Sequence, residues 1–221
     1  MLVDTATYAQ INADLLQRRV TLVAVSKTKT AEQVKALYDL GHRDFGENYV
    51  QELMDKQAAL PHDIRWHFIG HLQRNKVKKL IPFVYLIQSV DSLKLLKEIN
   101  KHAGRAEKVI HCLLQVHIAT EETKFGLDET ELAELLGHLA ANEKEMKWVS
   151  IKGLMGMASL TGDMARVRNE FRRLKAIFER VRTQISGFTI LSMGMSGDYR
   201  IAIEEGSNLV RIGTLLFGER S

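Results

Sequence analysis

Cysteine is nearly absent from this chain, because Cys112 is the only one among its 221 residues. No disulfide can form within the chain, and a reducing cytosol fits this composition best. The sequence therefore predicts a cytoplasmic protein. Cys112 lies within an apolar segment, so we expect a buried hydrophobic side chain rather than a nucleophile.

Long hydrophobic runs are missing as well. The longest apolar run, residues 80–87, contains eight residues and includes Pro82. A membrane-spanning helix needs about 20 apolar residues in succession. The first residues include Asp4 and lack both the apolar segment and the cleavage site of a signal peptide. We expect neither a membrane partner nor a secreted product.

Proline is scarce, with residues at positions 61 and 82 only, and no Ser/Pro-rich or low-complexity stretch interrupts the chain. A linker between domains is therefore not expected. A chain of 221 residues can bury one sizeable core and is short for two. The sequence predicts a single domain over residues 1–221, with a leading helix at 1–18 and the main body at 21–218.

Charge is close to balanced, since 31 basic and 27 acidic residues give a net charge of +4. The basic surplus is local, at residues 74–79 and along 166–182. Such clusters can bind nucleic acid. They are more often the solvated face of an amphipathic helix, which is the interpretation adopted here. We therefore expect no nucleic-acid partner.

Short apolar segments rich in β-branched or aromatic residues alternate with segments of helical period along the whole chain. The predicted strands are residues 21–26, 43–46, 65–69, 83–89, 109–118, 149–157, 188–193 and 209–217. The predicted helices are residues 4–18, 31–40, 49–59, 74–80, 92–103, 128–141, 163–184 and 197–205. Alternating strands and helices predict a parallel sheet. Eight such units match a (β/α)8 TIM barrel, with residues 21–218 forming the barrel.

An open doubly wound sheet is the alternative fold. That fold usually has fewer strands and often carries a glycine-rich turn after its first strand. The turn here is Lys27-Thr28-Lys29-Thr30, which contains no glycine. The barrel is therefore preferred, and its chemistry is expected at the carboxyl ends of the strands.

Lys27 ends the first predicted strand. Alternation along residues 22–27 places Val23, Val25 and Lys27 on one face, and branched residues are favoured inside a barrel. Lys27 would then point into the barrel mouth. Burial and the neighbouring Lys29 both favour the uncharged amine that forms an imine. The alternative is a lysine that marks a strand end and extends to solvent.

Two glycine–hydroxyl segments follow the seventh strand and lie within the eighth. The first is Ser192-Met193-Gly194-Met195-Ser196-Gly197, and the second is Gly213-Thr214. Glycine lets backbone N–H groups approach an anion, and the loops after strands 7 and 8 are the usual phosphate site of this barrel. The alternative is that Ser196 only caps a helix and Gly194 only makes a turn.

Arg211 lies inside the apolar eighth segment and must point into the barrel or at the surrounding helices. It cannot lose its charge and needs hydrogen-bond acceptors. An ordinary explanation is a salt bridge with a carboxylate such as Glu47 or Glu204.

At these residues the sequence resembles the pyridoxal 5′-phosphate (PLP) homeostasis proteins, small single-domain relatives of the N-terminal barrel of alanine racemase. The matching segments are long and run from the first strand to the last. They are residues 23–27, 45–52, 66–76, 153–155, 191–196 and 210–214.

The resemblance implies that PLP is the cofactor and that Lys27 holds it as a Schiff base. It implies that the phosphate lies against Ser196, Gly213 and Thr214, with Ser192 and Met193 lining that loop. It places Arg211 at the pyridine nitrogen, where a cation weakens the ring as an electron sink, as in alanine racemase. Asn48 is expected near the ring hydroxyl and His67 near the ring.

One strand departs from the usual form of the family. The fifth reads Gln115-Val116-His117-Ile118, where an asparagine is expected in place of His117. The chain continues through residues 121–126 in a pattern close to the usual acidic residues followed by Lys-x-Gly. Whether His117 contacts the cofactor or only lines the barrel stays open.

A carrier without turnover is the preferred function. Alanine racemases complete their active site with a second domain, and only three residues follow Gly218 here. An open cofactor face exposed to water weakens electrostatic catalysis. The resemblance therefore implies a monomeric PLP carrier or buffer in vitamin B6 homeostasis, with PLP-dependent apo-enzymes as candidate recipients.

Two enzymatic alternatives remain. A racemase of the alanine racemase type needs two opposed proton-transfer groups. Lys27 could be one, while Tyr49, His67 and His117 are merely available for the other. A Schiff-base aldolase acting on phosphosugars would use the same lysine and phosphate loops, although such barrels usually carry the lysine on a later strand.

No metal site is expected. His67 and His71 would lie roughly 13 Å apart on a straight strand, too far to share one ion, and no Cys or carboxylate has suitable spacing. The methionines at strand ends are expected to pack the barrel mouth. They are Met155, Met157, Met193 and Met195.

Overall fold

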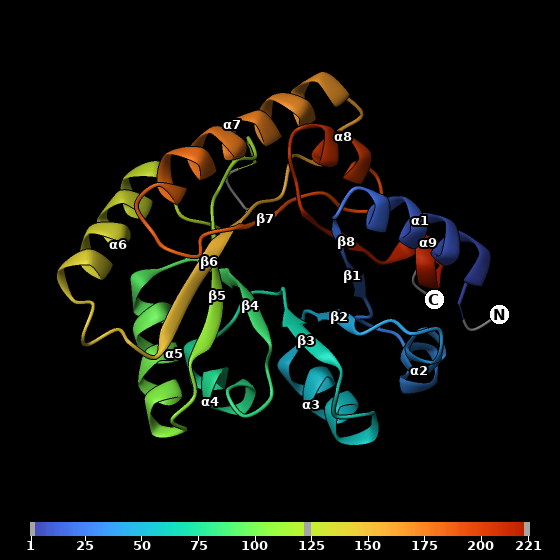
Figure 1. The fold of residues 1–221 in the computed structure, drawn as a ribbon, viewed down its shortest axis with the longest axis horizontal. Coiled ribbons are helices and arrows are strands. Elements are labelled where there is room, and N and C mark those ends of the chain that lie inside the picture. The colour runs from blue at the N-terminus through green and yellow to red at the C-terminus, as the bar shows by residue number, and fades with distance from the viewer. Residues whose placement is uncertain (1–2, 122–124, 219–221) are drawn as a thin grey trace.

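The structure of the chain, a computed structural model, describes residues 3–121 and 125–218. Within these residues eight strands pair in sequence order, and β8 pairs with β1 to close the barrel. All eight pairings are parallel. Figure 1 shows the strands at the centre of the molecule with the helices around them. The predicted TIM barrel is therefore confirmed, and the doubly wound alternative is wrong.

The elements follow one another in the predicted order. The strands are β1 Thr21–Val25, β2 Asp44–Glu47, β3 Arg65–Phe68, β4 Leu86–Val90, β5 Ile110–Gln115, β6 Val149–Met155, β7 Ile190–Ser192 and β8 Leu209–Ile212. The helices are α1 Thr5–Gln17, α2 Ala31–Asp39, α3 Val50–Ala59, the 3-10 turn η1 Arg74–Lys76, α4 Val77–Leu80, α5 Leu93–Arg105, α6 Glu129–Ala141, α7 Met164–Arg182, α8 Tyr199–Glu204 and α9 Thr214–Phe217.

Two predicted strands are wrong at one end. Residues 214–217, predicted as strand, form the short helix α9, because the N–H groups of Leu216 and Phe217 turn back to the carbonyl of Gly213. The fourth strand starts at Leu86 rather than at residue 83. The N–H groups of Phe83 and Val84 both donate to the carbonyl of Leu80, which keeps this segment in a turn.

Local sequence signals set the start of the longer helices. Thr30 accepts a hydrogen bond from the backbone of Gln33, whose side chain accepts one from the backbone of Thr30, and α2 begins between them. Asp128 and Glu131 make the same reciprocal pair before α6. Each capping box satisfies two backbone N–H groups that the helix itself cannot bond.

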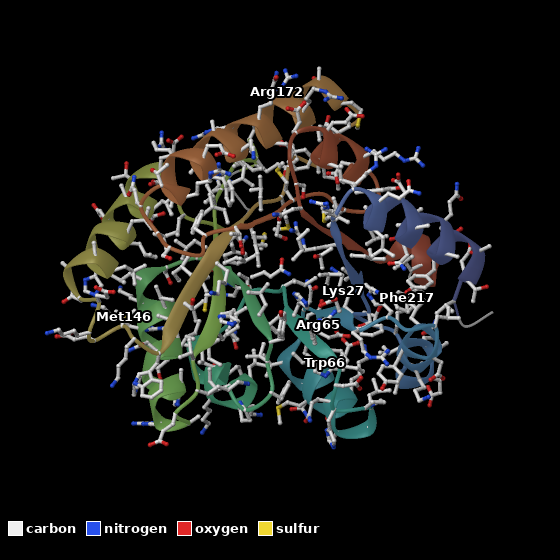
Figure 2. All side chains as sticks on the ribbon, viewed as in Figure 1. Lys27, Arg65, Trp66, Met146, Arg172 and Phe217 are labelled. Carbon is white, nitrogen blue, oxygen red and sulfur yellow. The ribbon has the colours of Figure 1, made fainter. Side chains whose placement is uncertain are left out.

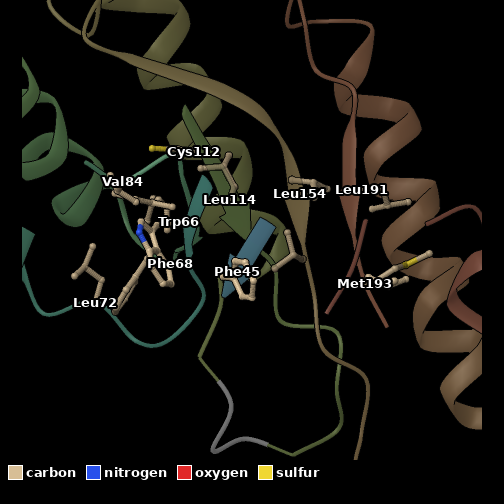
Figure 3. Packing of buried hydrophobic residues seen from close by; sticks show 14 of the residues in the cluster. Phe45, Trp66, Phe68, Leu72, Val84, Cys112, Leu114, Leu154, Leu191 and Met193 are labelled. Carbon is tan, nitrogen blue, oxygen red and sulfur yellow. The ribbon is translucent and has the colours of Figure 1, made fainter. Parts of the chain in front are cut away.

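The hydrophobic side chains form two layers. Leu22 and Ala24 of β1 join a large cluster between the strands and the helices, whereas Val23 between them joins a separate cluster. Alternation along a strand assigns the second cluster to the barrel interior. Its buried members are Val23, Leu86, Leu113, Met155 and Leu209. The inward direction predicted for Val23 is confirmed, and Figure 3 shows the outer layer around Phe45, Trp66 and Phe68.

The basic residues of α7 have acidic partners on neighbouring helices. Arg168 pairs with Glu205 at 2.6 Å, and Arg173 and Arg180 pair with Glu129 at 3.0 and 2.8 Å. These pairs lie at the surface, where each contributes less than about 1 kcal/mol. The interpretation of this stripe as a solvated helix face is confirmed. None of the helices in the described part of the chain is long and apolar enough to cross a membrane.

Gly153 in β6 provides a test of how tightly the barrel is closed. Its φ is +157°, and a Cβ there would lie 1.7 Å from the carbonyl oxygen of Ile190 on β7. We expect Gly153→Ala to lower the free energy of unfolding by about 3 kcal/mol or more, because backbone must move. Gly137→Ala is the control: no atom lies within 4 Å of its Cβ position in α6, and about 0.5–1 kcal/mol should be gained. Urea denaturation measures both, and similar stabilities would contradict the tight β6–β7 approach.

Candidate functional site

The carboxyl ends of the strands carry the polar residues singled out from the sequence. Lys27 follows β1, Asn48 follows β2, Ser196 follows β7 and Gly213 follows β8. Because β7, β8, β1 and β2 are consecutive around the barrel, all four positions belong to neighbouring strands. This rim is where TIM barrels place their chemistry.

Lys27 is half-buried and lies just beyond β1, where Figure 2 labels it. The next residue, Thr28, has a positive φ of 64°, an uncommon conformation for a residue other than glycine. The chain therefore turns sharply at the lysine. Such a conformation persists only where surrounding contacts hold it.

Those contacts come from α3. Glu52 accepts a hydrogen bond from the backbone N–H of Thr28 at 2.6 Å, on one side of Lys27. Lys56 donates to the backbone carbonyl of Ser26 at 2.6 Å, on the other side. Lys56 and Glu52 also pair with each other at 2.6 Å. The backbone that presents Lys27 is thus held from both directions.

A fully buried carboxylate completes this arrangement. Glu47 Oε1 accepts hydrogen bonds from Lys56 Nζ at 2.7 Å and from the Ser26 hydroxyl at 2.6 Å. Burial raises the pKa of Glu47, although the charge of Lys56 opposes that shift. Glu47 Oε2 has no hydrogen-bond partner among the described residues. Sequence reasoning identified neither Lys56 nor Glu52 as part of the site.

The two glycine–hydroxyl segments meet in space. The Ser196 hydroxyl accepts a hydrogen bond from the backbone N–H of Gly213 at 3.3 Å. The backbone N–H groups of Ser196, Gly197 and Thr214 have no acceptor among the described residues. A Cβ at Gly213 would lie 3.0 Å from the carbonyl oxygen of Val25, so the backbone approach needs glycine. Free N–H groups beside two hydroxyls form a cradle suited to an anion.

The alternative explanation of these segments is wrong in one part. Asp198, not Ser196, occupies the cap position of α8, and the Ser196 hydroxyl binds Gly213 instead. Gly194 does make the turn: its φ is +98°, and a Cβ there would lie 2.6 Å from the Cβ of Ala202.

Arg211 points into the barrel and is buried. Its Nη1 donates to the Ser192 hydroxyl at 2.5 Å, and its Nη2 donates to the carbonyl of Gly156 at 3.0 Å. The expected salt bridge with Glu47 or Glu204 is wrong, because Glu47 pairs with Lys56 and Glu204 pairs with Arg168. Burial lowers the pKa of Arg211 to about 10, so the guanidinium stays charged at neutral pH.

From Ser192 a chain of hydrogen bonds continues through the barrel interior. The Ser192 hydroxyl donates to Gln88 Oε1 at 2.7 Å, and Gln88 Nε2 donates to His67 Nδ1 at 3.0 Å. His67 Nε2 then donates to Asp44 Oδ1 at 3.0 Å, and Asp44 also binds Arg65. Both ring nitrogens of His67 thus have a hydrogen-bond partner within this series. Sequence reasoning missed Gln88 and Asp44, although a glutamine within the apolar segment 86–90 was a usable signal.

Asp44 is the acidic end of this chain. Burial alone would raise the pKa of Asp44, but hydrogen bonds from Arg65 and His67 outweigh it and hold that pKa well below its usual range. The carboxylate is therefore ionised near neutral pH. It balances Arg65 directly and orients His67.

Two predicted site residues, His67 and Met193, lie away from the cradle, and so does His117, whose role the sequence left open. His67 is buried in the interior chain, and the Met193 side chain is fully buried in the outer hydrophobic layer shown in Figure 3. His117 follows β5, and its Nε2 donates to the carbonyl of Glu121 at 2.9 Å. Residues 122–124 of the following segment lie outside the described residues.

Comparison with known proteins places this rim in context. The sequence model of the alanine racemase N-terminal domain matches residues 6–221. The pyridoxal phosphate homeostasis protein of Aquifex aeolicus is 41% identical over 201 residues, which are 90% of this chain and 86% of that protein. The human protein of the same name is 39% identical over 213 residues, covering 90% and 76%. This chain belongs to the pyridoxal phosphate homeostasis protein family.

Solved structures agree with that family assignment. The PipY protein of Synechococcus elongatus, determined with PLP bound, superimposes with a TM-score of 0.87 at 35% identity, covering 96% of this chain and 99% of that one. An alanine racemase from Bartonella henselae superimposes with a TM-score of 0.72 at 20% identity, covering 96% of this chain and 60% of that one. The second likeness shows the shared barrel fold of the homeostasis proteins and the racemases.

Replacing Lys56 tests whether the buried charges hold the turn at Lys27. We expect Lys56→Met to lower the free energy of unfolding by about 3–5 kcal/mol, because it leaves the Glu47 carboxylate buried without its cation. Lys35→Met is the matched control, since Lys35 forms an exposed pair with Asp39 worth less than about 1 kcal/mol. Urea denaturation measures both, and equal small losses would show that the buried pair does not stabilise this region.

Proposed function

We propose that this chain binds PLP through Lys27 and serves intracellular PLP homeostasis as a carrier or buffer rather than as an enzyme. The observation that best supports this proposal is that three features lie together at the ends of consecutive strands. An amine held on a fixed turn ends β1, a buried arginine lies on β8, and a cradle of N–H and hydroxyl donors follows β7 and β8. The PLP-bound PipY structure and the homeostasis proteins of similar sequence support the same cofactor.

The chemistry of these residues fits the three ends of PLP. Lys27 would hold the aldehyde carbon through a Schiff-base linkage. The cradle of Ser196, Gly213 and Thr214 would hold the phosphate, because free N–H groups and hydroxyls are the donors that a phosphate dianion takes. Arg211 uses two donor nitrogens on protein acceptors and has no carboxylate partner among the described residues. It would face the pyridine nitrogen, with Ser192 holding it in place.

The positions of Asn48, His67 and Met193 indicate how each would contribute to PLP binding. Asn48 follows β2, and its Oδ1 is buried without a partner among the described residues, which suits a hydroxyl on a ligand. His67 would act on the ring only indirectly, through Gln88 and Ser192. Met193 would support the loop by packing in the outer layer.

The carrier role rests on what surrounds Lys27. Bound PLP supplies an electron sink, and racemisation also requires a second proton-transfer group opposite the lysine. Both ring nitrogens of His67 are occupied by Asp44 and Gln88, and His117 Nε2 is occupied by Glu121. The guanidinium of Arg211, held by Ser192 and Gly156, would face the ring nitrogen of bound PLP and would disfavour its protonation, which would weaken that electron sink.

Setting and partners complete the proposal. We propose a cytoplasmic monomer in which residues 1–221 form one domain, with PLP-dependent apo-enzymes as recipients. Thr214 and Gly197 of the cradle are exposed, so a bound phosphate would stay accessible from solvent. Access of that kind suits a protein that gives up its ligand.

Covalent capture tests the lysine assignment. We expect the chain incubated with PLP to show an imine absorption band that borohydride removes, leaving one adduct on Lys27 by peptide mass mapping. Lys27→Ala should lose the band and the adduct, because it removes the amine that would form the imine. Lys29→Ala is the control and should keep both.

Two results would contradict the proposal. An adduct on Lys29 or Lys76 in the unaltered chain would refute the site. Sustained racemisation of L-alanine by the PLP-loaded chain, lost in Lys27→Ala, would replace the carrier role with that of an enzyme. Chirality of the amino acid is followed by chromatography.

Comparing PLP with pyridoxal tests the phosphate cradle. We expect Ser196→Ala combined with Thr214→Val to weaken PLP binding by about tenfold or more, because two hydroxyl donors to a charged group are lost. Binding of pyridoxal, which has no phosphate, should change by less than about twofold. Absorbance titration gives both constants. Equal weakening of the two aldehydes would place the phosphate elsewhere.

A further inference from the structure

A second polar cavity lies on another part of the same rim, between the start of α3 and the η1–α4 segment. Its volume is 290 Å³, and its polar lining includes Asn48, His71, Gln73, Lys76 and Lys79. These residues follow β2 and β3, whereas the cradle follows β7 and β8. Asn48 is the only residue that this cavity shares with the proposed PLP contacts.

The cavity has two lysines and no carboxylate. No aspartate or glutamate lines it. Lys76 and Lys79 are half-buried, and neither has an ion-pair or hydrogen-bond partner within residues 3–121 and 125–218. Their neighbour Lys78 is exposed and does not line the cavity. Two ammonium groups that line one cavity without a carboxylate repel each other, so an anion in this space would be attracted by both.

The rest of the lining is mixed, with Val50 and Phe68 as its apolar side chains and with Asn48 and His71 among its polar ones. Asn48 Oδ1 is buried without a hydrogen-bond partner in the described part of the chain. His71 Nδ1 lies 3.1 Å from Asp91 Oδ2, and the His71 ring stacks on Phe125 with the ring centroids 4.0 Å apart. The loops after β3, β4 and β5 are thereby joined at one wall of the cavity. Asn48 calls for a hydrogen-bond donor, which a hydroxyl on the ligand would supply.

We propose that this cavity binds phosphate, either free or as a small phosphate monoester. Lys76 and Lys79 would contact the phosphoryl oxygens, because lysine binds phosphate as a point charge and two cations match a dianion. Where PLP does not occupy it, Asn48 Oδ1 would accept a hydrogen bond from the alcohol part of an ester, whereas the two lysines serve this cavity alone. The volume is at the small end for ligand sites, which favours an ester of few atoms. The site does not depend on the proposed binding of PLP.

Calorimetric titration with inorganic phosphate and with glycerol 3-phosphate tests the proposal. We expect saturable binding that Lys76→Gln with Lys79→Gln weakens by about tenfold or more. Arg74→Gln with Lys78→Gln removes the same charge from residues outside the lining and should weaken it by less than about threefold. Tighter binding of the ester would identify a phosphate monoester, and equal binding would identify free phosphate.

Failure of this proposal is distinguishable from failure of the PLP proposal. Binding to the cavity should persist in Ser196→Ala with Thr214→Val, which alters only the cradle. Loss of phosphate binding in that variant alone would assign it to the cradle and overturn the second site. Equal weakening by both lysine and arginine replacements, or no saturable binding, would also overturn it.

Acetylation of the unaltered chain tests the same proposal without relying on the folding of any variant. Phosphate at saturating concentration should protect Lys76 and Lys79 from an acetylating reagent, as measured by peptide mass mapping, and leave Lys78 equally reactive. Unchanged modification of Lys76 and Lys79 would contradict the proposal.

Discussion

A buried positive charge without an adjacent negative one organises the interior of this barrel. The Arg211 guanidinium is held by one hydroxyl and one carbonyl, and the nearest link to a carboxylate runs through Ser192, Gln88 and His67 to Asp44. The Asp198 carboxylate attracts this charge without a direct ion pair, and oriented dipoles supply the hydrogen bonds to it, so each member of the chain must keep its direction of donation. The interior polar residues therefore act as one unit, and apolar residues such as Val23 and Leu113 fill the space that remains.

Much of the architecture could be predicted because the relevant signals are local. Short apolar segments rich in β-branched or aromatic residues marked the strands, segments of helical period marked the helices between them, and polar residues at strand ends marked the rim. The polar chain could not be predicted, because Ser192 and Gln88 are 104 residues apart and meet only once the barrel closes. Thr214–Phe217 was misassigned because β-propensity of an apolar run does not show where a backbone carbonyl at Gly213 captures the following N–H groups.

Two parts of the rim differ in the groups that they offer to an anion. Loops after β7 and β8 contribute backbone N–H groups and hydroxyls, which are neutral donors held by close glycine contacts. The η1–α4 segment after β3 contributes the lysine ammonium groups of Lys76 and Lys79, which carry full charge on flexible stems. Neutral donors bind an anion with defined geometry, whereas ammonium groups attract it over a longer range and with less directional preference. Asn48 belongs to both parts, because it lines the lysine cavity and is also a proposed PLP contact.

The turn at Thr28 has a consequence for how a ligand would leave. Its left-handed backbone is already secured by Glu52 and Lys56, so occupancy of the lysine would not have to order a loop. Little conformational entropy would then be lost on arrival, and little would be regained on departure. Residence time at such a rigid amine is governed by how fast the carbon–nitrogen bond hydrolyses or is transferred, rather than by the opening of a lid.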